Sequence, residues 1–322
     1  MISVICPVYN EEHYIIHLME FFLAAPPVEK ELILVDGGSK DKTVAIIEEY
    51  AQKFPQIILL HNPDKYVSFA LNKAIHAAKG SYIIRLDAHT SYADDYFVQV
   101  LKTFERTGAD IVGGPTRTTF KTAFQRAVGY CISTKMGVGD SKVHDDQYEG
   151  YTDTVTFGSW RKDLFDTVGY FDVQLMRNQD DEFGYRAKSF GKTLYLNPAI
   201  KLWYYPRSTL KGLFKQYYQY GLYKPLVLKK VGSEAKLRHF IPAFFTLYVL
   251  TLPLAILFPL WLMPLALYVL LSMLFAIRCD GGWMEKIYCI VIYPAVHIAY
   301  GSGFLLGLNK KPKLNTTIPT SK

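Results

Sequence analysis

Residues 240–277 form a run of 38 residues that contains no Asp, Glu, Lys or Arg. About 20 apolar residues suffice to cross the hydrocarbon core of a bilayer, so the run predicts two short membrane spans, or one span and an interfacial piece. Pro253, Pro259 and Pro264 predict a break, with a tight turn at residues 258–264. The alternative is a group of buried helices within a large soluble core.

The charges before this run indicate its orientation. Residues 201–239 carry nine Lys or Arg and one acid, Glu234, whereas residues 1–200 carry 21 Lys or Arg and 26 Asp or Glu. Basic residues before a first span mark the cytoplasmic side of a membrane, and anionic lipid headgroups are their expected partners.

A second uncharged run, residues 287–309, is a third and weaker candidate for a membrane span. Three lysines follow it, Lys310, Lys311 and Lys313, and they also favour the cytoplasmic side, which conflicts with three complete crossings. One of the apolar runs is therefore expected to be re-entrant or interfacial.

Charge and cysteine usage exclude several classes of protein. The net charge of +7 does not indicate nucleic-acid binding, because residues 1–200 are net acidic and contain no compact aromatic and basic module. Four cysteines without CxxC spacing disfavour a zinc site or a disulfide framework. The chain opens on an apolar run without a basic leader or a cleavage site, so we expect its first half to remain in the reducing cytoplasm.

Apolar runs alternate with amphipathic segments through the first 112 residues. This alternation predicts an α/β fold with a mainly parallel sheet and helices on both faces. We expect Asn10 to cap the first helix. Strands are expected at residues 2–8, 31–35, 57–60, 81–86, 110–112 and 193–196, and helices at residues 11–23, 41–53, 68–79, 94–106, 162–168 and 180–189.

Two acidic motifs directly follow strand-like runs, at the sheet edge where open α/β sheets bind ligands. The first is Asp36-Gly37-Gly38-Ser39. Its carboxylate could accept hydrogen bonds from a base or a ribose hydroxyl, although a simple turn that caps the next helix explains the same pattern.

The second motif, Asp87-Ala88-His89, offers a carboxylate and an imidazole two residues apart. Together with the oxygens of a bound diphosphate, these groups suit Mg²⁺ or Mn²⁺. A turn histidine with one local hydrogen bond is the alternative for His89.

A third cluster, Gln179-Asp180-Asp181-Glu182, begins a predicted helix. Acids at a helix start ordinarily complement the helix dipole. Three adjacent acids exceed what this role needs, and a carboxylate placed here could deprotonate an acceptor hydroxyl as a general base.

These motifs, in this order, resemble those of the family 2 inverting glycosyltransferases of the GT-A fold. Within that family the chain resembles the succinoglycan type of exopolysaccharide glycosyltransferase. The segments that carry the resemblance are Cys6-Pro7-Val8-Tyr9-Asn10-Glu11, the three acidic motifs, Tyr204-Tyr205-Pro206-Arg207-Ser208 and Gln216-Tyr217-Tyr218-Gln219-Tyr220-Gly221, followed by the apolar C-terminal region.

The resemblance implies a role for each matching residue. Pro7, Tyr9 and Glu11 would line the nucleoside site, Asp36 would bind uracil or ribose, and Asp87 with His89 would hold Mg²⁺ or Mn²⁺ on the sugar diphosphate. Asp180, rather than Asp181, would be the catalytic base of a single in-line displacement that needs no covalent enzyme intermediate.

The acceptor side is implied less directly. Its expected residues are Trp160, Asp181, Gln216 and Gln219. A core aromatic remains the alternative for Trp160. Gln179 stands where the family usually has Glu, and Gln216, Gln219 and Tyr220 replace a Q-x-x-R-W element, which disfavours processive synthesis of a long polymer.

The expected substrates are a nucleotide-sugar donor, a UDP-hexose, and a polyprenyl-linked or other lipid-linked acceptor at the cell membrane. Arg207, Lys211 and Lys215 either contact the acceptor's diphosphate or form a solvated flank. Two other readings are a nucleotide-binding enzyme of another type, disfavoured because no G-x-G-x-x-G or P-loop follows a strand, and an inactive membrane scaffold.

The expected domain organisation has four parts: a cytoplasmic GT-A domain at residues 1–225, a basic juxtamembrane segment at 226–239, a membrane region at 240–309 and a basic tail at 310–322.

Overall fold

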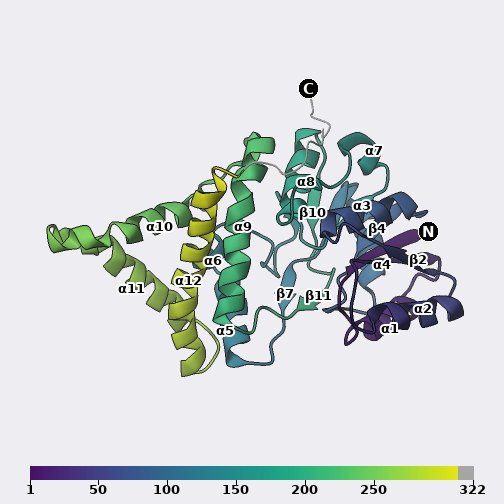
Figure 1. Ribbon diagram of the computed structural model, residues 1–322, viewed down its shortest axis with the longest axis horizontal. Helices are drawn as coiled ribbons and strands as arrows, with labels where there is room; N and C mark the ends of the chain where they lie inside the picture. Colours follow the sequence, from purple (N-terminus) through teal and green to yellow (C-terminus); the bar gives the residue numbers. More distant parts are fainter. Residues whose placement is uncertain (311–322) are drawn as a thin grey trace. The chain divides into compact units, whose positions relative to one another are not determined.

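The computed structural model describes residues 1–310, which form two compact units. Unit 1 comprises Met1–Arg117 and Asp145–Tyr204; unit 2 comprises Thr118–His144 and the described residues from Tyr205 onward (Figure 1). This division groups segments by their packing and does not test the predicted borders after residues 225 and 239. The predicted borders with the membrane remain a prediction, and Lys311 and Lys313 lie outside the described residues.

The main sheet of unit 1 is mixed. Its order is β3-β2-β1-β4-β9-β6-β10-β8. The pairs among β3, β2, β1 and β4 are parallel, as is β6 with β10, whereas β9 and β8 run antiparallel to their neighbours. The strands are β1 (Ile2–Val8), β2 (Lys30–Asp36), β3 (Ile57–His61), β4 (Tyr82–Arg85), β6 (Ile111–Gly113), β8 (Gly150–Tyr151), β9 (Ser159–Arg161) and β10 (Leu194–Leu196). The predicted α/β fold is confirmed, with the antiparallel β9 as an insertion that the alternation did not reveal.

A smaller sheet has the order β5-β11-β7. Its strands are β5 (Thr90–Tyr92), β11 (Leu202–Tyr204) and β7 (Thr116–Thr118). Because β5 begins one residue after His89, it brings the chain back from the edge where Asp87 lies.

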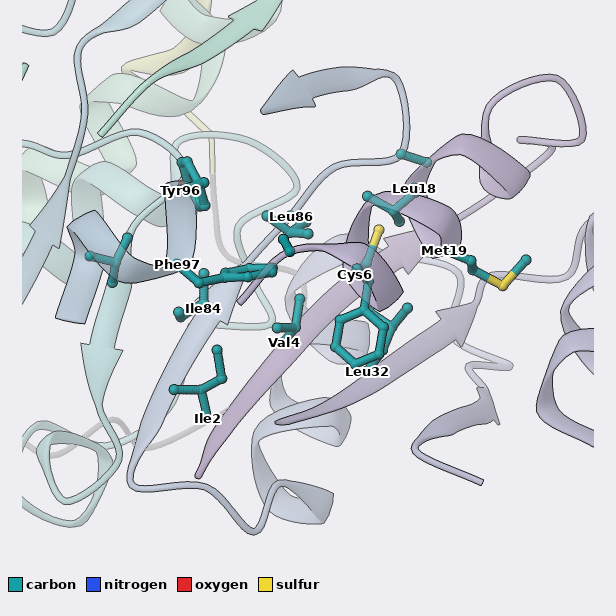
Figure 2. Packing of buried hydrophobic residues seen from close by; sticks show 14 of the residues in the cluster. Ile2, Val4, Cys6, Leu18, Met19, Leu32, Ile84, Leu86, Tyr96 and Phe97 are labelled. Carbon is teal, nitrogen blue, oxygen red and sulfur yellow. The ribbon is translucent and has the colours of Figure 1, made fainter. Parts of the chain in front are cut away.

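Helices cover both faces of the main sheet, as predicted. Successive residues of a strand point to opposite faces, so Val4 and Cys6 pack on one side and Ile5 on the other. Figure 2 shows Val4 and Cys6 with residues of the helices on their side. That side carries α1 (Ile15–Ala24), α2 (Thr43–Lys53) and α4 (Tyr96–Thr107), and the other carries α3 (Val67–Ala77), α7 (Leu164–Val168) and α8 (Gln179–Ser189).

The first helix begins later than predicted, and Asn10 is not its cap. Asn10 has φ of 55°, and its side-chain oxygen accepts a hydrogen bond from the Lys40 backbone N–H at 2.8 Å. The cap position of α1 is Tyr14. The expected cap was wrong because the partner of Asn10 lies in another loop, 30 residues away in sequence.

Unit 2 is helical. Its elements are α5 (Ala123–Ser133), α6 (Lys135–Val138), α9 (Leu210–Lys230), η1 (Gly232–Glu234), η2 (Leu237–His239), α10 (Ile241–Leu250), η3 (Leu252–Ile256), η4 (Pro259–Leu262), α11 (Met263–Ile277) and α12 (Trp283–Gly307). Helices α9 and α12 pack backbone against backbone: a Cβ added to Gly303 would lie 2.1 Å from the Tyr218 carbonyl oxygen. Glycine is therefore required where these two helices touch.

Within residues 1–310, two apolar helical segments are long enough to cross a membrane, Pro259–Ile277 and Trp283–Gly307. They fit the predicted C-terminal membrane region. The predicted break is confirmed, although it begins earlier, where α10 ends at Leu250 and short 3-10 turns lead to α11.

Candidate active site

Arg85 joins two of the predicted site residues. Its Nε donates to Asp87 Oδ1 at 3.1 Å, and its Nη1 lies 2.9 Å and 3.0 Å from the two carboxylate oxygens of Asp180. The Arg85 side chain is only 8% exposed. Asp87 follows β4, and Asp180 lies in the first turn of α8. The contact between Arg85 and Asp180 therefore joins two elements that are 95 positions apart in sequence.

Opposing effects act on the pKa values of Asp180 and Arg85. Burial raises the pKa of Asp180, Arg85 lowers it, and Asp87 and Asp181 raise it again, with a net rise. Burial alone would lower the pKa of Arg85, but Asp180 and Asp87 raise it overall, so the guanidinium stays charged. A carboxylate with a raised pKa is a better proton acceptor than an ordinary Asp.

The three adjacent acids of α8 have three different partners. Asp180 pairs with Arg85, Asp181 Oδ1 accepts a hydrogen bond from Thr154 Oγ1 at 3.0 Å, and Glu182 pairs with Arg186 at 2.7 Å. The residue at the cap position of α8 is Asn178, whose side chain makes no cap hydrogen bond. The cluster therefore combines a site residue, a loop contact and a buried structural ion pair.

The loops after β1 and β2 are tied to each other. The Asn10 N–H donates to Ser39 Oγ at 2.9 Å, and the Glu11 N–H donates to Thr43 Oγ1 at 2.8 Å. Asp36 accepts hydrogen bonds from the backbone N–H groups of Gly38 and Ser39 at 2.9 Å and 3.1 Å. Gly38 has φ of +86°, which a residue with a side chain rarely adopts.

Asp36 therefore shapes its own turn and is buried, at 3% exposed. Tyr9, in contrast, is 53% exposed, and Pro7 is half-buried at the end of β1. The structure places these three residues on adjacent parallel strands or just beyond them, as predicted. Whether they bind a nucleoside remains a prediction.

The residues predicted to hold a metal lie at the same edge. The His89 Nδ1 is 3.2 Å from Glu11 Oε1, and Asp87 is 20% exposed. Among residues 1–310 no group of three or more His, Cys, Asp or Glu side chains converges as a metal site. One carboxylate and one imidazole still fit an ion that takes its remaining ligands from phosphate oxygens.

The residues predicted on the acceptor side are divided between the two units. Trp160 is 3% exposed on β9 and packs edge-on against Phe165, Phe171 and Phe183 in the core. Gln216 and Gln219 belong to α9 of unit 2, where Gln216 Nε2 donates to the Tyr220 hydroxyl at 2.9 Å. The core interpretation thus describes the location of Trp160.

Among the residues that the structure describes, four other than glycine have positive φ, and several of them adjoin the site. They are Asn10, Lys65, Phe157 and Asn178. Asn178 immediately precedes α8, and the Phe157 ring centroid is 5.7 Å from the Arg85 guanidinium carbon. Such backbone conformations are costly and concentrate at functional sites.

Arg85 is the functional residue that sequence reasoning missed. A signal was present, because an arginine ends the otherwise apolar strand β4, two residues before Asp87. A buried guanidinium needs carboxylate partners, and Asp87 and Asp180 were the nearest candidates in the motifs.

The fold is that of the GT-A glycosyltransferases. The structure of a mannosyltransferase from Pyrobaculum calidifontis, in complex with GDP-Man and Mn²⁺, superimposes with a TM-score of 0.62 at 17% identity, over 94% of this chain and 86% of that one.

The chain belongs to glycosyl transferase family 2, whose model matches residues 3–169. The succinoglycan biosynthesis protein ExoA of Rhizobium meliloti (strain 1021) is 31% identical over 242 residues, 74% of this chain and 73% of that protein. A dolichyl N-acetyl-alpha-D-glucosaminyl phosphate 3-beta-D-2,3-diacetamido-2,3-dideoxy-beta-D-glucuronosyltransferase of Methanococcus voltae is 30% identical over 240 residues, 71% of this chain and 74% of that protein. The chain is therefore a glycosyltransferase, as the resemblance of its motifs predicted.

Proposed function

We propose that this enzyme transfers a sugar from a nucleotide-sugar, a UDP-hexose, to a lipid-linked acceptor at the cytoplasmic face of the cell membrane. The product would enter an exopolysaccharide or another cell-surface polysaccharide. The observation that carries the proposal is the Arg85 side chain, which holds the acid of the metal motif and the expected base against one cation.

The proposed reaction is a single displacement with inversion. Asp180 accepts the proton of an acceptor hydroxyl while its oxygen attacks the anomeric carbon. The bond from that carbon to the diphosphate oxygen breaks, and its electron pair leaves with the nucleoside diphosphate. An α-linked donor then gives a β-linked product.

Different residues would orient the catalytic base, hold the metal ion and bind the nucleobase. Arg85 fixes the Asp180 carboxylate by contacting both of its oxygens, which orients the base before substrate arrives. A divalent ion held by Asp87 and His89 would supply positive charge to the leaving diphosphate. Tyr9, which is 53% exposed, is available to stack on the nucleobase of the donor, and Asp36 would accept a hydrogen bond from that nucleobase.

The lipid-linked acceptor is supported by the relatives and by the apolar helices. One relative is named for succinoglycan synthesis, and the other is named for transfer to a dolichyl phosphate-linked sugar. Polyprenyl chains lie in the bilayer, so an enzyme that uses them needs access to the membrane surface. The two apolar segments of unit 2 fit this requirement.

The test is a transfer assay with radiolabelled donors. Membranes that contain the wild type, Asp180→Asn or Asp166→Asn receive UDP-glucose, UDP-galactose, UDP-N-acetylglucosamine or GDP-mannose, with Mg²⁺, Mn²⁺ or EDTA, followed by lipid extraction. Asp166 is an exposed acid of α7 and serves as the matched control.

We expect metal-dependent label in the lipid fraction from one UDP-hexose, lost in Asp180→Asn and kept in Asp166→Asn. Label from GDP-mannose alone would correct the donor. Equal label with Asp180→Asn would reject Asp180 as the base, and no label from any donor would reject the lipid-linked acceptor.

A further inference from the structure

We propose that residues 241–277 enter one leaflet of the bilayer and return to the side from which they came, so that they anchor the enzyme without crossing. These residues comprise α10, η3, η4 and α11 and are called the hairpin below. In Figure 1 both helices run from α12 to a common tip. The inference rests on the proposed membrane attachment and deepens it.

The tip of the hairpin is its most exposed apolar part. Ile256 is 85% exposed, Leu257 72%, Phe258 64% and Leu260 77%. A turn that emerged into water on the far side of a membrane would carry polar or charged residues, but residues 251–262 contain none that is charged. The tip is therefore suited to end within hydrocarbon.

The length of the shorter arm limits the depth of the tip. Helix α10 has 10 residues, which span about 15 Å at a rise of about 1.5 Å per residue. The short helix η3, with five residues that rise about 2.0 Å each, adds at most about 10 Å before the tip, so this arm falls short of the hydrocarbon core, which is about 30 Å thick. Since α11 shares its tip with α10, its greater length cannot place the tip on the far side.

Several polar groups at the break between α10 and α11 are paired inside the hairpin. The Tyr248 hydroxyl donates to the Trp261 carbonyl oxygen at 2.7 Å and accepts from the Leu265 N–H at 3.1 Å. The Trp261 indole N–H donates to Thr251 Oγ1 at 3.0 Å. Irregular backbone tolerates hydrocarbon only when its hydrogen bonds are satisfied in this way.

Both ends of the hairpin carry basic residues. Lys236 and Arg238 precede α10, and Arg278 follows α11 directly. Arg238 also pairs with Asp140 at 2.6 Å, which ties this end to the rest of unit 2. Basic residues at both ends favour the same, cytoplasmic side and contact with anionic headgroups.

Helix α12 does not call for a second insertion. Half of the apolar stretch of α12 is buried inside the protein, compared with 11% of that of Pro259–Ile277. Its Gly303 and Gly307 contact α9, and Cys289 is fully buried near Ala127 of α5. Protein therefore covers much of α12, while the apolar surface of α11 has no such cover.

The first test measures binding of the full chain to vesicles of phosphatidylethanolamine and phosphatidylglycerol by flotation. Leu257→Asp and Phe258→Asp place a charge at the tip, and Val28→Asp, at a position 93% exposed in unit 1, is the matched control. We expect the tip variants to lose at least about tenfold in binding and the control to keep it. Unchanged binding of both tip variants would overturn the proposal.

The second test maps the side of the membrane with single cysteines and an impermeant maleimide in cells and inverted vesicles. The native cysteines are buried, so their background is low. Lys53→Cys in α2 marks the side of unit 1, Asp280→Cys marks the end of α11, and Ile256→Cys marks the tip. We expect the first two to react from the same side and the tip to react only after detergent.

Reaction of Asp280→Cys and Lys53→Cys from opposite sides would show that α11 crosses, and reaction of the tip without detergent would show that it lies in water. Either result overturns the proposal. The same variants are also assayed for hydrolysis of the nucleotide-sugar donors, which tests the proposed function separately. If the labelling is as expected but no donor is hydrolysed, only the proposed function is rejected.

Discussion

The two units of this glycosyltransferase depart from the usual distribution of polar and apolar groups in opposite ways. Unit 1 buries charged side chains, among them Arg85 at 7%, Arg186 at 4% and Glu182 at 1% exposed. Unit 2 exposes large apolar side chains along residues 244–277. Buried charges require partners within the protein, whereas exposed apolar surface requires a partner outside it.

The comparison is tested most strongly at Asp180. We expect Asp180→Asn to lower kcat for transfer about 10²- to 10⁴-fold without lowering the thermal midpoint of unfolding. The stability of the variant follows from the raised pKa of Asp180. A carboxyl group that holds its proton more tightly when folded destabilises the fold once it ionises, so its removal costs little.

Glu182 should behave in the reverse manner. Its carboxylate pairs with Arg186 at 2.7 Å and 3.0 Å, and Arg186 also donates to the Tyr170 carbonyl oxygen. Glu182→Ala leaves a buried cation unpaired and should lower the free energy of unfolding by about 3 kcal/mol or more, measured by urea titration. The double variant Glu182→Ala with Arg186→Met should regain part of the lost free energy of unfolding. A loss in the double variant as large as in the single variant would contradict this expectation.

Arg85 should affect catalysis more than donor binding. Without the guanidinium, Asp180 loses its contact at both oxygens, so Arg85→Gln should lower kcat about 10²-fold and change the donor KM much less. Arg85→Lys should recover part of the rate. Arg161→Lys, on β9 and away from the acids, is the control; a parallel loss there would point to a general effect on the sheet.

The pH dependence gives a smaller effect with a defined sign. Burial raises the pKa of Asp180 and Arg85 lowers it, and the base works only when ionised. The acidic limb of kcat/KM should therefore lie at higher pH than for an exposed Asp, whose pKa is about 3.9. Arg85→Gln removes the lowering cause, so the limb should move to still higher pH; a shift to lower pH would contradict this account.

The smallest effect is expected at Trp160. Because it is packed in the aromatic core, Trp160→Phe should lower the thermal midpoint and leave the acceptor KM unchanged. A raised acceptor KM with unchanged stability would instead support the predicted role at the acceptor.

Strands β1, β2 and β4 of unit 1 were predictable because each is a short, mostly buried apolar run. β2 is buried at all seven positions, and its prediction differs from the structure by one residue at each end. The antiparallel β9 has three residues and no pattern of its own. Its place between β4 and β6 depends on partners distant in sequence.

Helix α9 was read as a basic segment because its lysines and tyrosines show no clear apolar stripe, and Pro225 lies inside it. Its contacts come from glycines on both sides, Gly221 on α9 itself and Gly303 and Gly307 on α12. Contacts made through glycines do not produce a periodic pattern of apolar residues, so the sequence did not predict this helix.

For the site, the acids were predictable from their positions after strands, but their partners were not. Asp87 and Asp180 were both named, yet the shared cation between them depends on how α8 lies against β4. The structural role of Glu182 was also not predictable. All three acids lie in the first turn of α8, and only the burial of Glu182 in the folded protein distinguishes it from Asp180 and Asp181.

Phe157 limits how far this enzyme can be redesigned for heat tolerance. Its φ of 53° is one that glycine adopts without strain, but its ring packs against the core of unit 1 and lies 5.7 Å from the Arg85 guanidinium carbon. Phe157→Gly would relieve the backbone and lose both contacts. A library screened for melting temperature would therefore meet opposing effects at this position, and the unusual backbone conformation would persist through many rounds of selection.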